Sequence, residues 1–360
     1  MPDLLSAVLS FAVPLGITLF VLPKFAHIAS ALGLVDQPGR RKVHKTPRPL
    51  VGGLAMSLGV AIGCLLFMPM TLIKGHGGSS MRGFYAGLVI LVLIGFFDDF
   101  REVHHRLKFL VQIIAAIMVV YFSRVSLTTF GDLLHLGSID FPPLGIPMTV
   151  LGIVGVINAL NMIDGIDGLA GGVSLVAFAS FAFLAFVDGH TTIMLLCLAI
   201  SGALVAFLKY NWHPSRLFMG DAGSLFLGFS AGFVSIDITQ DTGSLVKPVA
   251  PLLVLAVPIT DTLIVMTKRV IKGKSPFYAD KTHLHHILLK FGFTKRQTAV
   301  IIIAMTAAFS LLAIAGTLLD IPEYDLFLIF LIYFFSYFSA SFFVKRILHN
   351  RRTKDGSVAA

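Results

Sequence analysis

The sequence predicts an all-α protein that crosses a membrane many times, as a single domain over residues 1–360. Hydrophobic residues fill 56% of the positions and charged residues only 13%, about half the charged share of a soluble domain. Mean hydropathy is +0.88, and long apolar runs follow one another along the chain. This composition excludes soluble, disordered and disulfide-scaffold proteins. Both cysteines, Cys64 and Cys197, lie inside apolar runs, which predicts buried thiols rather than a disulfide or metal pair.

The expected membrane spans follow from the length of the apolar runs, because a helix needs about 20 apolar residues to cross a bilayer. By this measure the chain has about eleven spans. They are 4–22, 51–73, 83–99, 108–123, 147–163, 168–187, 191–208, 224–238, 247–267, 297–319 and 325–345. No basic residue precedes the first span and no small-residue cleavage site follows it, so we expect a helix there rather than a signal peptide.

The basic residues predict the orientation of these spans. With the N-terminus outside, 24 of the 28 Lys and Arg residues fall on inner segments. Cytoplasmic segments of membrane proteins carry such an excess of positive charge. The sequence therefore predicts an outer N-terminus and a cytoplasmic C-terminus, and explains the net charge of +9 without nucleic acid as a partner. The longest outer segment, 124–146, combines alternating apolar residues with Gly and Pro, which predicts a short hairpin.

Acidic residues gather at the inner ends of the predicted spans, where an unpaired carboxylate is costly. Asp98 and Asp99 end a span at the negative pole of its helix dipole. A cation must offset them, and the candidates are Arg101, Arg106, Lys108 or a divalent metal. The alternative is a solvated helix end, but two adjacent acids at a membrane favour metal or phosphate chemistry.

A second cluster lies in the motif NALNMIDGIDGLAGG. Its members Asn158, Asn161, Asp164 and Asp167 recur every three residues among glycines. Amides, carboxylates and close backbone approach suit a hard cation and a nucleotide. A tight turn capped by one Asp is the alternative, and it leaves the other polar residues unexplained.

Asp221 lies in the motif FMGDAGSLFLG, just before the predicted span 224–238. One interpretation makes its side chain the N-cap of that helix. The other makes the helix N-terminus part of an anion or metal–phosphate site. The presence of two further acid clusters on the same face favours the second.

The inner segment 268–296 holds eight basic residues together with His283, His285 and His286. Such a segment suits phosphates, sugar hydroxyls and anionic lipid headgroups, whereas a structural zinc site lacks a cysteine ligand here. The loop 36–50 is also basic. Asp261 lies inside the ninth span, and we expect it to pair with Lys268 or Arg269.

Taken together, acids and bases on one membrane face predict phosphoryl transfer between a nucleotide-type phosphate and an anionic lipid. Mg²⁺ is the expected ion, with Mn²⁺ as a substitute, because Mg²⁺ binds through one or two carboxylates plus substrate phosphate oxygens.

The five motifs DQPGRRKVHKTPRPLVGG, GFFDDFREVHHRLKFLVQ, NALNMIDGIDGLAGG, FMGDAGSLFLG and HLHH together resemble the polyprenyl-phosphate N-acetylhexosamine-1-phosphate transferase family. The resemblance covers about residues 36–294. It implies a Mg²⁺-dependent enzyme of a bacterial cytoplasmic (inner) membrane, with its active site facing the cytoplasm. The implied substrates are a UDP-sugar and undecaprenyl phosphate, and UMP is released; a homodimer is an open alternative to a monomer.

The resemblance also assigns roles to individual residues. It implies that Asp98 is the base that deprotonates the lipid phosphate, with Asp99 beside it in the Mg²⁺ site and Asp221 as a metal ligand. Asn161 and Asp164 match an active-site pair. The remaining matches are substrate-binding or catalytic positions: Lys45, Lys108, Asp167, Asn211, Phe218, His283, His285 and His286.

Leu284 interrupts the triple-His run of the branch that transfers phospho-MurNAc-pentapeptide. HLHH after a basic stretch, together with an eleventh span, resembles instead the branch that uses UDP-GlcNAc in teichoic acid, O-antigen or related synthesis. The pentapeptide branch stays as an alternative. A secondary transporter or lipid flippase is an alternative of another class, disfavoured because the acids sit at one leaflet and no internal repeat is visible.

Overall fold

The computed structural model describes residues 4–37, 46–67, 80–241, 243–275 and 282–356, with the backbone alone for 67 and 344–356. Lys45 lies outside these residues. Helices dominate this part of the chain, and one small antiparallel pair joins β1 (Val35–Asp36) to β2 (Arg48–Pro49).

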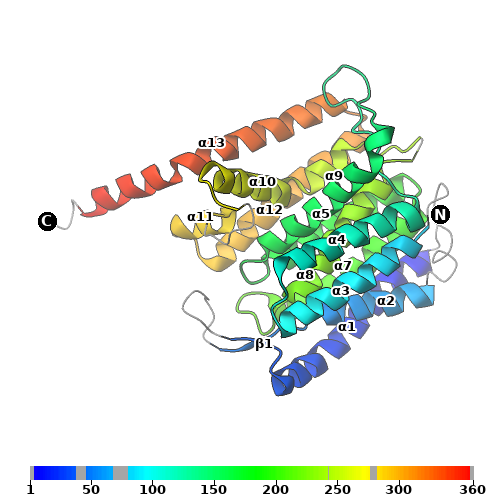
Figure 1. Ribbon diagram of the computed structural model, residues 1–360, viewed down its shortest axis with the longest axis horizontal. Coiled ribbons are helices and arrows are strands. Elements are labelled where there is room, and N and C mark those ends of the chain that lie inside the picture. The colour runs from blue at the N-terminus through cyan, green and yellow to red at the C-terminus, as the bar shows by residue number, and fades with distance from the viewer. Residues whose placement is uncertain (1–3, 38–45, 68–79, 242, 276–281, 357–360) are drawn as a thin grey trace.

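The helices pack side by side in a bundle, from which the end of the last helix projects (Figure 1). In chain order they are α1 (Leu4–Leu32), α2 (Gly52–Phe67), α3 (Arg82–Phe100), α4 (His105–Met118), α5 (Gly145–Ile163), α6 (Leu169–Val187), α7 (Thr191–Asn211), α8 (Gly220–Asp237), α9 (Val249–Val254), α10 (Ala256–Ile271), α11 (Leu284–Lys290), α12 (Lys295–Leu318) and α13 (Glu323–Gly356).

A helix lies at each of the eleven predicted spans, and eight of the described helices are long and apolar enough to cross a membrane. The chain is therefore an all-α, multi-pass membrane protein; the number and direction of the crossings stay predictions. Two details differ from the prediction. The first and last helices continue beyond their predicted ends, and the ninth span divides at Leu255 into α9 and α10. Pro258 explains the division, because it has no N–H to donate to Val254 yet fits the first turn of a new helix.

Helix α8 is almost entirely buried and packs closely against its neighbours through glycines. A Cβ on Gly95 of α3 would overlap the backbone of Asp221 and Ala222, and a Cβ on Gly228 would overlap Ile157 of α5. Small residues allow membrane helices this close approach. The tight packing brings the start of α8 against the end of α3, which places two of the predicted acid clusters together.

The segment before α5 forms the predicted hairpin. Two backbone hydrogen bonds cross it: Phe130 N–H donates to the Ile139 carbonyl (3.1 Å), and Ile139 N–H donates to the Gly131 carbonyl (2.9 Å). We call residues 126–141 the hairpin loop. It lies beside the start of α13 (Figure 1), where the rings of His135 and Tyr324 are 4.3 Å apart.

Candidate active site

Asp99, at the end of α3, caps the N-terminus of α8. Its two carboxylate oxygens accept hydrogen bonds from the backbone N–H groups of Asp221 (2.7 Å) and Ala222 (3.2 Å). The positive end of the α8 dipole favours a carboxylate here. The interpretation of Asp221 as an N-cap side chain is therefore wrong, because the cap comes from Asp99. These contacts favour a structural role for Asp99 over its predicted role in metal binding.

Lys108 of α4 joins the other two acids. Its ammonium lies 2.9 Å from Asp98 Oδ2 and 2.8 Å from Asp221 Oδ2. Asn161 of α5 donates to the second oxygen of Asp221 (3.1 Å) and to Ser224 (2.7 Å). The structure thus brings together residues from four helices, and one of the predicted cations, Lys108, offsets the acids.

The side chains around Lys108 also show whether a divalent ion fits this site. No group of three His, Cys, Asp or Glu residues in the described ranges is placed to hold a metal ion. Asp98 and Asp221 nevertheless face a shared cation, the Lys108 ammonium. Two carboxylates are enough for Mg²⁺, which completes its coordination with water and phosphate oxygens. Asp98 and Asp221 are therefore the residues that fit Mg²⁺.

A polar cavity of about 610 Å³ opens beside this cluster. Among the predicted site residues, its walls include Lys108, Asn161, Asp221, His283, His285 and His286. Arg106 and Arg269, predicted from the sequence only as partners of acids and without a substrate role, also line the cavity.

His283 takes part in a buried network rather than pointing freely into the cavity. Its Nδ1 donates to Asp261 (2.8 Å), and its Nε2 lies 3.3 Å from the Arg269 guanidinium. Asp261 also accepts from Leu284 N–H (2.8 Å) and from the Tyr337 hydroxyl of α13 (2.7 Å). The predicted pairing of Asp261 with Arg269 is thus mediated by His283, and the network fixes the start of α11.

His285 is 2% exposed, and neither ring nitrogen has a hydrogen-bonding partner among the described residues. Burial, with the neighbouring His286, lowers the pKa of His285 to about 3. The ring is therefore neutral at pH 7. A buried, unpaired imidazole on a cavity wall is costly unless a ligand supplies its partner, so His285 is suited to contact a substrate.

Gly165 makes room for this ring, because a Cβ at Gly165 would overlap the imidazole of His285. We expect Gly165→Ala to displace His285 and lower transfer activity about 10- to 100-fold, as small misplacements in a site do. Steady-state rates on purified protein measure the effect. Gly16→Ala, on α1 with no atom near its added Cβ, is the matched control. Full activity of the Gly165 variant would show that the position of His285 is unimportant.

The predicted residues Asp167 and Asn211 hold two loops together outside the lining of this cavity. Asp167 accepts from His213 (2.8 Å) and Ser215 N–H (3.3 Å). Burial alone would raise its pKa, but these hydrogen bonds hold the pKa of Asp167 below its usual range. Asn211 accepts from Gly168 N–H (2.9 Å) and donates to the Leu217 carbonyl (2.9 Å). Both residues therefore have structural partners.

Asp164 and Phe218 also lie outside the lining of the cavity. Asp164 is exposed at the end of α5. The backbone of Phe218 binds Pro49 and Gly52 (2.9 and 3.0 Å), which ties the segment before α8 to β2 and α2. Their predicted contacts with substrate stay predictions.

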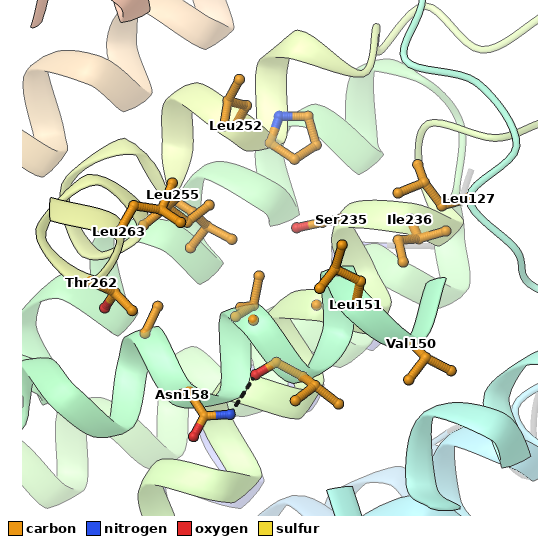
Figure 2. Close-up of a pocket in the computed structure, with 18 of the residues that line it drawn as sticks. Leu127, Val150, Leu151, Asn158, Ser235, Ile236, Leu252, Leu255, Thr262 and Leu263 are labelled. Atoms are coloured by element: carbon orange, nitrogen blue, oxygen red, sulfur yellow. Dashed lines mark hydrogen bonds between the residues drawn. The ribbon is translucent and has the colours of Figure 1, made fainter. Parts of the chain in front are cut away.

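An apolar cleft of about 790 Å³ adjoins the polar cavity. Phe109 and Asn158 line both spaces, so the two meet at these residues. Figure 2 shows Asn158, Thr262 and Leu263 on one side of the cleft and Leu127 and Ile236 on the other. Its walls come from α4, α5, α8, α9, α10 and the hairpin loop. A ligand with a charged head and a long apolar tail fits this pair of spaces.

Comparison with known proteins gives a consistent result. Residues 81–239, which include Asp98 and Asp221, match the model of glycosyl transferase family 4. The chain is 36% identical over 308 residues to a probable undecaprenyl-phosphate N-acetylglucosaminyl 1-phosphate transferase of Bacillus subtilis, covering 85% of this chain and 84% of the relative. It is 33% identical over 346 residues to the undecaprenyl-phosphate α-N-acetylglucosaminyl 1-phosphate transferase of Escherichia coli K12, covering 92% of each.

Proposed function

The chain belongs to glycosyl transferase family 4, and from this premise we propose that it transfers GlcNAc-1-phosphate from UDP-GlcNAc to undecaprenyl phosphate. The names of its relatives support both substrates. The excess of basic residues on the predicted inner segments supports an active site on the cytoplasmic side of a bacterial inner membrane.

The observation that carries the proposal is the junction of the two spaces at Phe109 and Asn158. The apolar cleft suits a polyprenyl tail. The polar cavity offers Lys108, Arg106 and Arg269 to phosphates. A lipid phosphate and a nucleotide diphosphate would thus meet beside Asp98 and Asp221.

In the mechanism we propose, an oxygen of the lipid phosphate attacks the β-phosphorus of the UDP-sugar. The bond from this phosphorus to the bridging oxygen breaks, and UMP leaves with the electron pair. Asp98 takes a proton from the lipid phosphate, and the cationic side chains balance the phosphate charge. Bound through Asp98 and Asp221, Mg²⁺ would supply further charge neutralisation at the phosphate oxygens.

The test is UMP release by the purified protein with a panel of UDP-sugars. We expect release with UDP-GlcNAc only when undecaprenyl phosphate and Mg²⁺ are both present, loss with EDTA, and recovery with Mg²⁺ or Mn²⁺. Preference for UDP-MurNAc-pentapeptide would support the other branch. Uptake of a solute into vesicles without UMP release would support the transporter alternative and overturn the proposal.

A further inference from the structure

The hairpin loop forms the end of the apolar cleft farthest from the polar cavity. Three of its side chains, Leu127, Phe130 and Leu133, line the cleft there. Thr239 near the end of α8 and Pro248 just before α9 line the same end. The residues shared with the polar cavity, Phe109 and Asn158, lie at the other end.

Hydrogen bonds to α5, to α13 and to the turn that follows α8 hold the hairpin loop in place. The Leu127 N–H donates to Thr149 of α5 (2.7 Å). Gln240, just after α8, accepts from the N–H groups of Thr128 (2.8 Å) and Thr129 (3.1 Å) and donates to the carbonyl of Thr129 (3.2 Å).

A further bond joins the Asp132 N–H to Glu323 of α13 (3.3 Å). These anchors come from elements that also pack around the cleft or beside it. The loop is therefore a fixed wall rather than a loose cover.

The length of the cleft follows from α5, whose lining residues run from Pro147 to Ala159. At 1.5 Å per residue this stretch covers about 18 Å, less than the roughly 30 Å of hydrocarbon in a bilayer. A lipid whose phosphate lies in the polar cavity enters the cleft at Phe109 and Asn158. It can therefore reach the hairpin loop only with isoprene units well removed from that phosphate.

We infer that the hairpin loop is the end wall of the lipid cleft and sets the prenyl length beyond which binding no longer improves. This inference rests on the proposed function, because it takes a polyprenyl phosphate as the occupant. A short chain does not reach Phe130. A longer chain packs on Phe130 and Leu133, and any further isoprene units must leave the cleft sideways into the bilayer.

The experiment measures KM and kcat for a series of prenyl phosphates, from geranyl to undecaprenyl, with the full-length protein. For the wild type we expect KM to fall with chain length and then to level off. Phe130→Ala should raise KM about five- to tenfold for the long lipids, with kcat and the KM of the shortest lipids unchanged, because only long tails lose the apolar contact.

Two further variants make the result specific. Leu263→Ala, on the side of the cleft where Asn158 lies (Figure 2), should raise KM for every length. Leu136→Ala, exposed on the same hairpin and outside the cleft, should raise none. An equal rise for all lengths in Phe130→Ala, or no rise at all, overturns the inference while the proposed function stands. If no prenyl phosphate of any length supports UMP release by the wild type, the proposed function fails, and the inference with it.

Discussion

Replacing Asp221 with asparagine is expected to lower the rate of sugar-phosphate transfer at least about 100-fold without unfolding the protein. The carboxylate accepts from Lys108 and Asn161 on its two oxygens. The amide removes one negative charge from the pair that fits Mg²⁺, and it replaces an acceptor of the Lys108 ammonium with a weaker one. Apparent Mg²⁺ affinity should fall together with kcat.

Folding should survive this change because the start of α8 does not depend on the Asp221 side chain. Asp99 caps the helix through backbone N–H groups, and asparagine keeps those groups. Activity against Mg²⁺ concentration, with thermal unfolding in detergent, separates the two effects. Asp237→Asn, at the other end of α8, is the control. Wild-type turnover in the Asp221 variant would remove Asp221 from the metal site.

The sequence predicts the helices well because long apolar runs have few other solutions in a bilayer. Its failures have local causes. The division at Leu255 depends on one missing N–H, and the short α11 is too polar and too brief to be recognised as a span. The hairpin was predictable from its turn residues, whereas its contact with α13 was not.

The acid pair shows why the site was only partly predictable. Asp98 and Asp99 are adjacent, yet successive residues on a helix point about 100° apart. Asp98 therefore meets Lys108, and Asp99 meets the N-terminus of α8. Which acid faces which neighbour depends on how α3 is rotated in the bundle, and the motif alone does not contain that rotation.

Contacts between residues far apart in the sequence explain why the other partners in the site were not predicted. Asp261, His283 and Tyr337 come from separate parts of the chain, and the first and the last are 76 positions apart in the sequence. The sequence predicted that Asp261 lies inside a span, and a buried polar group is stable only with a hydrogen-bonding partner. The identity of those partners follows from packing. The same reasoning applies to Asn211, whose amide joins two loop backbones.

Asp98→Asn is expected to lower kcat by about 10²- to 10⁴-fold, the usual contribution of a general base. At saturating Mg²⁺, which offsets the loss of one metal-binding carboxylate, binding of UDP-GlcNAc should stay within about threefold, because Lys108 keeps its contact with Asp221 and the cavity walls are unchanged. Calorimetry with UDP-GlcNAc and lipid-dependent UMP release measure the two quantities. Glu102→Gln, an exposed acid just after α3, is the matched control and should keep full activity.

The same residue also distinguishes direct transfer from a two-step route. If the lipid phosphate attacks directly, wild-type protein incubated with β-³²P-labelled UDP-GlcNAc and no lipid should release no UMP and retain no label. If Asp98 is instead a nucleophile, it forms a phosphoryl-aspartate, UMP is released in one burst, and the label stays on the protein. Label on the wild type but not on Asp98→Asn would replace the base in our mechanism with a covalent intermediate. Absence of label, together with a loss of kcat in the variant that saturating Mg²⁺ does not restore, would leave proton transfer as the function of Asp98.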